Sequence, residues 1–180
     1  MKSDKKLTRI IIPCRLSYLN CFSPISINDS EPKYSVSAII PKNDTKTIAA
    51  IKNAIEQAKR NSISKWGGKI PTNLRLPLRD GDIERPEDEA YEGCYFINAH
   101  SNYPPQVVDA RVNPITDKSE IYSGCYGNIS VNFYGYKKNG NMGIAAGLGN
   151  IQKVLDAEPL GDRATAQEEF TVITEDNFLS

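Results

Sequence analysis

The sequence has few of the residues that build common catalytic and metal centres. Its only histidine is His100, and its four cysteines form no CxxC pair, whereas a structural zinc site normally needs two close pairs of Cys or His ligands. The patterns GxxxxGK[ST], GxSxG and HExxH are also missing, so phosphate-binding loops and nucleophile triads have no motif here. We therefore expect no metal, no cofactor, reduced cysteines, and a packing or hydrogen-bonding role for His100.

Long apolar runs are absent as well. No stretch approaches the roughly 18 apolar residues of a membrane span, and the start of the chain has no apolar region that ends in a cleavage site. With 180 residues, of which 39% are hydrophobic, the chain suits one domain of ordinary size. We expect a soluble, unexported protein that works in the cytoplasm and binds no membrane.

A net charge is missing too, but this neutrality is the sum of oppositely charged segments. Residues 1–79 hold fifteen Lys and Arg against five Asp and Glu, whereas residues 80–92 hold one basic and seven acidic side chains. Residues 156–180 again hold one basic and seven acidic side chains. A basic body with an acidic tail is typical of a chain with a polyanionic partner and a detachable acidic segment, although such charges can also merely solvate separate surfaces.

Alternating apolar residues predict two half-buried strands near the start of the chain. In residues 7–22 and 33–41, apolar side chains fall on one face of each strand. The opposite faces are polar and carry the cations Arg9, Arg15 and Lys33. We expect these cations to face solvent.

A helix, shorter strands and a hairpin complete the predicted elements. Residues 44–62 place their isoleucines in one stripe, which is typical of a helix docked on its own sheet. Residues 94–101 predict a short strand and residues 122–138 the clearest one, followed by a type I′ hairpin signal, KNGN. The return strand is expected at 142–148, with a short turn or helix at 150–156. The fold class is therefore mainly β with one or two helices, a small five-stranded antiparallel barrel with a helix outside it.

Residues 64–92 predict a long loop that is basic in its first half and acidic in its second. Structureless connections of this length are uncommon in compact domains, which favours a functional loop or a mobile arm. Interleaved aromatics and cations are expected where single-stranded nucleic acid binds. The candidate residues here are Lys65, Trp66, Lys69, Arg75 and Arg79. Trp66 can equally be an apolar plug under the loop.

Aromatic residues on the polar face of a strand are the second group of candidates. Tyr134 and Tyr136 alternate with apolar residues, and Lys137 and Lys138 follow them directly. A base stacked on an aromatic ring gains about 1–3 kcal/mol whatever the base, so these residues are candidate contacts for bases and phosphates. Phe96 is a further candidate on the outward face of its strand. Tyrosines can also simply cover a sheet surface.

Four sequence blocks resemble those of one phage protein family. They are PLRDGD (77–82), PQVVDA (105–110), IYSGCYGNISVNFYGY (121–136) and GIAAGLGNIQKVLDAEPLG (143–161). The family, long without a known function, is similar in these blocks and comprises single-stranded-DNA-binding proteins of tailed phages and prophages with an oligonucleotide/oligosaccharide-binding fold. The resemblance implies such a domain at 1–161, which coats exposed single strands without sequence preference or catalysis during replication or recombination in the bacterial host.

Residues 162–180 form an acidic tail that also resembles tails in this class of protein. Such tails imitate a DNA strand or dock replication partners. The residues that match this pattern in kind are Glu168, Glu169, Glu175, Asp176 and Phe178. The resemblance therefore implies single-stranded DNA and phage replication or recombination proteins as partners, and a homodimer stays open. An ordinary flexible terminus is the alternative.

Two other functions stay open at this point. Asp80, Asp82 and Asp109, with Arg111 beside them, could form a metal-dependent nuclease site, although carboxylates in a DGD sequence are also common turn formers. The third candidate is a non-catalytic phage module whose aromatic face docks polypeptide.

Overall fold

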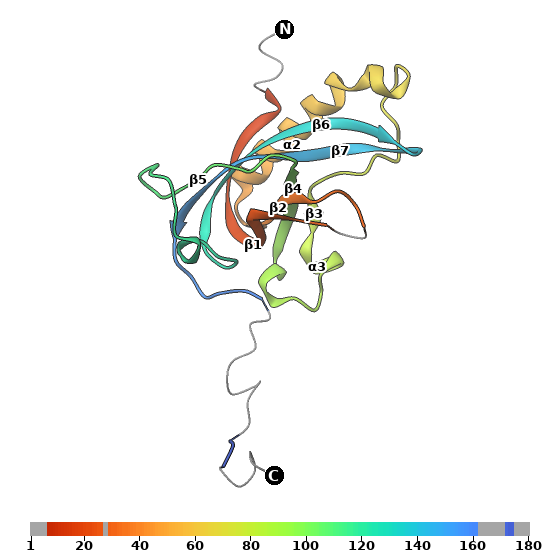
Figure 1. Ribbon diagram of the computed structural model, residues 1–180. Coiled ribbons are helices and arrows are strands. Elements are labelled where there is room, and N and C mark those ends of the chain that lie inside the picture. Colours follow the sequence, from red (N-terminus) through yellow and green to blue (C-terminus); the bar gives the residue numbers. More distant parts are fainter. Residues whose placement is uncertain (1–6, 27–28, 162–171, 175–180) are drawn as a thin grey trace.

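One continuous sheet organises the computed structural model, which describes residues 7–26, 29–161 and 172–174. The strand order in this sheet is β3-β4-β2-β1-β6-β7-β5 (Figure 1). The strands are β1 (Arg9–Ile25), β2 (Lys33–Pro41), β3 (Arg79–Asp80), β4 (Cys94–Ser101), β5 (Val107–Val108), β6 (Tyr126–Lys138) and β7 (Asn141–Leu155). The helices are α2 (Thr45–Asn61) and α3 (Gly81–Glu84), with the 3-10 turns η1 (Ile63–Trp66), η2 (Glu89–Tyr91) and η3 (Lys118–Glu120).

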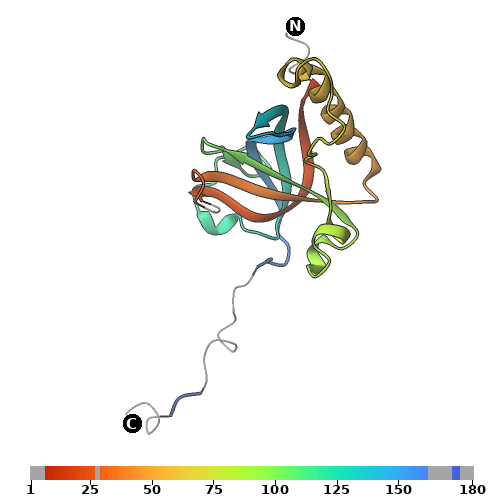
Figure 2. The ribbon, with the colours of Figure 1, turned by 90° about the vertical axis from the view of Figure 1, so that its right-hand side faces the viewer.

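Five of these strands close into a barrel. β4, β2, β1, β6 and β7 are neighbours in that order, and β4 also pairs with β7 at Ala99 and Ala146. This closing pair is parallel, whereas the other pairings around the barrel are antiparallel. The five-stranded barrel is confirmed, with a parallel closure in place of the wholly antiparallel one that the sequence predicts. Figure 2 shows the barrel with α2 along one side.

Side-chain alternation along the strands builds the core of the barrel. Ile129, Val131 and Phe133 of β6 are at most 2% exposed, while the residues between them are partly exposed. After β6, Asn139 and Gly140 have φ angles of 52° and 78°. Two successive positive φ angles are what a type I′ turn requires, so the predicted hairpin into β7 is confirmed.

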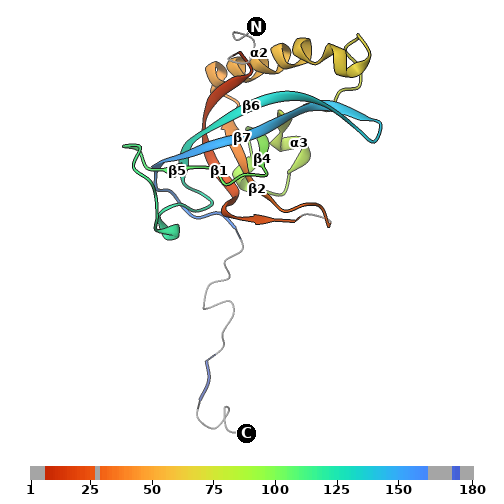
Figure 3. The ribbon, with the colours of Figure 1, turned by 45° about the horizontal axis from the view of Figure 1, so that its top comes forward.

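α2 has the position that its apolar stripe predicts. The side chain of Asp44 accepts a hydrogen bond from the backbone N–H of Thr47 at 3.3 Å and so caps the helix. Ile51 and Ile55 are buried, and the helix packs against β1 and β6 (Figure 3). No helix in the described part of the chain is long and apolar enough to cross a membrane.

The segment 64–92 differs from the long loop that the sequence predicts. It contains η1, β3, α3 and η2, and the side chains of Trp66 and Tyr91 within it are 7% and 0% exposed. The physical reason is that these two large aromatic side chains anchor an otherwise polar segment to the barrel.

β7 is also longer than predicted. Residues 150–155 continue the strand instead of forming a turn or helix, because Ile151 faces the core and pairs with Ile129 of β6. The cysteines are free as expected, and Cys21 is buried in the core, where burial raises the pKa of its thiol to about 11.

Candidate nucleic-acid interface

β6 presents Tyr134 and Tyr136 on the outer surface of the barrel. Phe133 and Gly135 face inward and are buried, while Tyr134 is 44% exposed and Tyr136 is partly exposed. This placement follows from the two-residue period of a strand. The expectation that both rings stand on the solvated face agrees with the structure.

The end of β6 that carries the tyrosines extends beyond β1, while its other edge stays paired with β7. The backbone N–H of Phe133 donates to the carbonyl oxygen of Thr8 at 2.9 Å, next to the start of β1. Beyond that point, the backbone N–H of Gly135 donates to Oγ of Ser62 at 3.1 Å, and Nζ of Lys65 donates to the Gly135 carbonyl at 3.0 Å. The end of α2 and η1 therefore take the place of a neighbouring strand.

Two aromatic residues predicted to contact DNA are buried instead. Nε1 of Trp66 donates to the carbonyl oxygen of Tyr136 at 3.1 Å, so Trp66 supports β6 from the inside. The expectation that Trp66 faces the ligand is wrong, and the alternative of an apolar plug is right. Phe96 is 1% exposed, and its ring packs edge-on against Tyr91 with centroids 5.1 Å apart. The outward face of β4 at Phe96 is covered by the segment that ends in η2.

Residues 75–80, which we call the strap, fill the space where β4 and β7 diverge. The backbone N–H of Arg75 donates to the Met142 carbonyl at 3.0 Å, and the N–H of Ile144 donates to the Arg75 carbonyl at 2.9 Å. At the other end of the strap, Arg79 pairs with β4. The strap thus places one arginine at the edge of β7 and another at the edge of β4.

Two neighbouring hollows lie on the outer surface around the hairpin of β6 and β7. We call the two together the basic groove. One, of about 350 Å³, lies between the strap, β2, β4 and the hairpin; the other, of about 460 Å³, lies between α2, η1, β1 and β6. Tyr134 lines both hollows. The predicted contact residues in the groove are Arg9, Lys33, Lys65, Arg75, Arg79, Lys138, Tyr134 and Tyr136. Its lining includes no Asp or Glu from the described part of the chain.

The positive charge of the groove is largely uncompensated by described residues. Of its Lys and Arg side chains, only Arg79 makes an ion pair with a described residue, Glu84, at 3.6 Å. The pKa of His100 is lowered by partial desolvation in the groove and by the charges of Lys33 and Arg79. The groove therefore offers a field that favours phosphate.

Small residues of β7 form the surface beside the two rings. Ala145 pairs with Tyr134, and a Cβ atom added at Gly147 would lie 3.4 Å from the Tyr134 ring. A Cβ atom at Gly143 would lie 2.8 Å from the hydroxyl of Tyr136. The Tyr134 ring therefore lies against small residues of β7, while Arg75 of the strap covers Gly143 beside Tyr136.

The remaining predicted contact residues lie outside the groove. Nε of Arg15 donates to the Gly124 carbonyl at 2.9 Å and Nη2 to the Glu158 carbonyl at 2.7 Å, so Arg15 anchors the chain after β7. Lys69 and Lys137 are exposed but line neither hollow. The predicted tail residues outside the described part of the chain are Glu168, Glu169, Glu175, Asp176 and Phe178.

The sequence interpretation missed Asn98 and His100 as groove residues. Both line the hollow beside Lys33. Their outward position was readable from the alternation in β4, which placed them on the same face as Phe96. What alternation could not show is that Phe96 is covered by another segment while its two neighbours on that face stay open.

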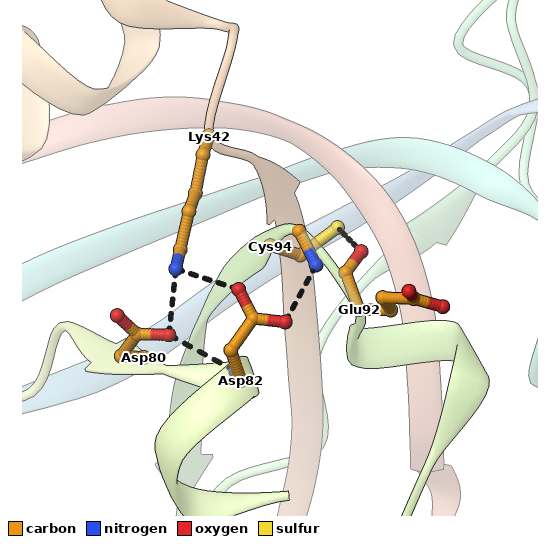
Figure 4. Close-up of polar contacts among 6 residues, drawn as sticks. Lys42, Asp80, Asp82, Glu92 and Cys94 are labelled. Carbon is orange, nitrogen blue, oxygen red and sulfur yellow. Dashed lines mark hydrogen bonds and ion pairs between the residues drawn. The ribbon is translucent and has the colours of Figure 1, made fainter. Parts of the chain in front are cut away.

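The carboxylates of the nuclease hypothesis have structural roles. Nζ of Lys42 lies 2.8 Å from Oδ1 of Asp80 and 2.8 Å from Oδ2 of Asp82 (Figure 4). The hydrogen bond from Lys42 holds the pKa of Asp82 below its ordinary value. Asp109 accepts hydrogen bonds from backbone N–H groups of its own turn. The described residues contain no group of three or more His, Cys, Asp or Glu that could hold a metal, so nothing here supports a nuclease arrangement.

Comparison with known proteins decides the family of this chain. The model of a family described as Enterobacter phage Enc34, ssDNA-binding protein, matches residues 8–179. The chain belongs to this family. The resemblance of the sequence blocks to a family of phage single-stranded-DNA-binding proteins is therefore confirmed.

Comparisons with individual proteins agree with this family assignment. Protein p50 of Acyrthosiphon pisum secondary endosymbiont phage 1 is 33% identical over 168 residues, which cover 87% of this chain and 88% of that protein. The single-stranded DNA-binding protein from bacteriophage Enc34, solved in complex with ssDNA, has a TM-score of 0.74 at 28% identity and covers 87% of this chain and 91% of its own. The likeness confirms the oligonucleotide/oligosaccharide-binding barrel. The single-stranded DNA-binding protein gp2.5 of bacteriophage T7 shares the fold, with a TM-score of 0.56 at 16% identity over 91% of this chain and 96% of its own.

Proposed function

We propose that the chain binds single-stranded DNA through the basic groove, without sequence preference and without catalysis. The observation that carries the proposal is a groove lined by six Lys and Arg side chains and two tyrosines, with no carboxylate among its described lining residues. Membership of the Enc34 family supports it. The setting we propose is phage DNA replication or recombination in the host cytoplasm.

Two physical contributions would drive this binding. Each phosphate neutralised by Lys or Arg releases condensed counterions, which favours association with any sequence. Stacking on Tyr134 and Tyr136 would add affinity for unpaired bases, because every base has a π-face but only an unstacked base can offer it. The combination accounts for a preference for single strands over duplex.

We further propose that the acidic tail, residues 162–180, competes with DNA for the groove or docks phage replication proteins. Its composition supports competition, because it holds five acidic side chains and one basic one. The chain just before the tail is held in place, since the backbone N–H of Leu160 donates to the Ser123 carbonyl at 2.8 Å. The homodimer stays a prediction.

Replacing Tyr134 by alanine tests the stacking. We expect Tyr134→Ala to weaken binding to a labelled oligo(dT) by about 1–3 kcal/mol, with little loss of stability because the ring is 44% exposed. Tyr126→Ala is the matched control: Tyr126 is in the same strand and is also 44% exposed, but the guanidinium of Arg15 lies 5.6 Å from its ring centroid. Fluorescence anisotropy gives the affinities and thermal unfolding the stabilities.

Two results would count against the proposal. Equal affinities of Tyr134→Ala and Tyr126→Ala would show that no base stacks on Tyr134. Absence of any binding to single strands by the unmodified chain at low salt would favour the polypeptide-docking alternative instead.

A further inference from the structure

A third hollow, of about 280 Å³, lies on the same outer face of the barrel as the basic groove. It is lined from β1 by Ile11, two positions after Arg9, and from β6 by Asn128 and Ser130, which precede Tyr134 on the same face. β5, β7 and the turn after β5 form its other walls. No charged residue from the described part of the chain lines it.

Small residues of β7 lie between this hollow and the tyrosines. On the outer face of β7, Gly147 lies beside the ring of Tyr134, and Gly149 comes next, facing Ser130. Beyond it, the backbone N–H of Asn150 donates to Oγ of Ser130 at 2.8 Å, at the near wall of the hollow. The outer face of β7 therefore places no large side chain between the tyrosines and the third hollow, so a polynucleotide can follow this strand from one to the other.

The walls of the third hollow combine open apolar surface with open amide groups. Ile11 and Val112 are 69% and 67% exposed. Oδ1 of Asn150 accepts the backbone N–H of Gln106 at 3.1 Å, which leaves its NH₂ group without a partner among the described residues. Nδ2 of Asn128 donates to Gln152, which leaves its oxygen likewise open among those residues. One open donor and one open acceptor beside the apolar side chains of Ile11 and Val112 suit the edge and the face of a nucleobase.

Val112 lies at the rim of the third hollow and has an unfavourable backbone conformation. Its φ angle is 65°, a value that β-branched residues rarely adopt. The turn is fixed by Asp109, whose Oδ1 accepts the backbone N–H groups of Arg111 and Asn113, both at 2.9 Å. Residues kept in such conformations cluster at ligand clamps, and this one presents an apolar side chain to solvent beside Ile11.

We infer that the third hollow is a nucleobase site that takes one base of the same DNA strand that crosses the basic groove. Its volume is about 280 Å³, which leaves room for one base. The base face packs on Ile11 and Val112, and its edge meets the open amides of Asn128 and Asn150. This inference rests on the proposed function, because it needs the groove to hold DNA.

Strand length tests the site. Oligo(dT) of increasing length, from about 4 to about 16 nucleotides, is titrated against the unmodified chain, Ile11→Ser, Val112→Gly and the control Ile83→Ser. Ile83 is an exposed isoleucine, 76% exposed, that lines none of the three hollows. Glycine adopts a positive φ readily, so Val112→Gly keeps the turn.

We expect the shortest strands that bind to show equal affinity for all four proteins. For long strands, Ile11→Ser and Val112→Gly should bind about five- to tenfold more weakly than the unmodified chain and Ile83→Ser. A single abasic position in the long strand should reproduce this loss in the unmodified chain but add little to it in Ile11→Ser, because both changes remove the same contact.

The results distinguish a failure of the nucleobase site from a failure of the proposed function. If Ile11→Ser and Val112→Gly bind every length as the unmodified chain does, the nucleobase site is wrong while the proposed function stands, and the third hollow is then a surface for another partner. If the unmodified chain binds no length of single strand, the proposed function fails and the nucleobase site fails with it.

Discussion

His100 is the only histidine of the chain and lies in the basic groove beside Lys33 and Arg79. Its pKa lies below the ordinary value of 6.5 because of desolvation and these two positive charges. Phosphates of a bound strand would act in the opposite direction and raise this pKa. A proton would therefore be taken up on binding, which makes affinity rise as pH falls.

We predict that affinity for single-stranded DNA rises a few-fold between pH 7.5 and pH 5.5 and that His100→Asn loses this rise. Acid has the opposite effect on the stability of the free protein. Because the pKa of His100 is lower in the folded than in the unfolded state, the free energy of unfolding falls as pH drops below 6.5. Anisotropy titrations and thermal unfolding at both pH values measure the two effects. An unchanged pH dependence in His100→Asn would place the titrating group elsewhere.

Single residues also show how far the sequence alone reaches. Alternation placed Tyr134 and Tyr136 on the outer face, because the side-chain direction in a strand depends only on local geometry. The same reasoning placed Phe96 outside, but a segment distant along the chain covers it. Trp66 has no periodic pattern around it, so only the general tendency of a lone Trp to be buried pointed to its place in the core.

At the scale of elements, η1 and the end of α2 act together as a substitute strand for β6. Ser62, Lys65 and Trp66 hydrogen-bond to the backbone of Gly135 and Tyr136. These bonds hold the edge of β6 that β1 leaves unpaired, so that the tyrosines project outward. Support of this kind involves residues about seventy positions apart, which no local sequence pattern indicates.

Trp66→Phe tests this support. We expect it to lower the free energy of unfolding by about 1–3 kcal/mol, because a buried hydrogen bond and part of a large side chain are lost. Affinity of the folded protein for single strands should change much less than in Tyr134→Ala. Denaturant unfolding and DNA titration under native conditions measure the two quantities. A large loss of affinity with unchanged stability would instead make Trp66 a direct DNA contact.

The strap shows a further limit of sequence reasoning about elements. The composition of 64–92 identified Arg75 and Arg79 as candidate contacts, and both line the groove. Their positions depend on how the strap pairs with β7 at Arg75 and with β4 at Arg79, beyond the parallel closure of these two strands. These are long-range pairings. Composition therefore predicted two of the cations that line the groove, but not how the segment is held.

At the scale of the whole molecule, neutrality conceals a separation of charge. The groove collects cations, Lys42 forms ion pairs with Asp80 at the end of the strap and with Asp82 just beyond it, and residues 162–180 hold five acidic side chains against one basic one. Segment counts predicted this separation, because charge along the chain can be read directly. Charge counts could not predict the groove itself, because its cations come from five separate parts of the chain: β1, β2, the strap, η1 and β6.

Removing residues 162–180 should tighten binding to single strands at low salt, because it removes a competing polyanion. The gain should fade as salt rises and screens the tail. A control with the full length but Glu168→Gln, Glu169→Gln, Glu175→Gln and Asp176→Asn separates charge from chain length and should behave like the truncation. Equal affinities of all three proteins at every salt concentration would contradict competition and leave partner docking as the role of the tail.

The most direct test of the central claim is the salt dependence of single-strand binding. With six cations in the groove and a slope of about −0.7 per phosphate contact, the logarithm of the association constant against the logarithm of salt concentration should fall with a slope of about −4. Lys33→Gln with Arg79→Gln should reduce this slope by about 1.4. Lys46→Gln with Lys52→Gln, on exposed positions of α2 outside the groove, should leave it unchanged. A slope near zero, or one that the α2 pair reduces as much as the groove pair, would contradict phosphate binding in the basic groove.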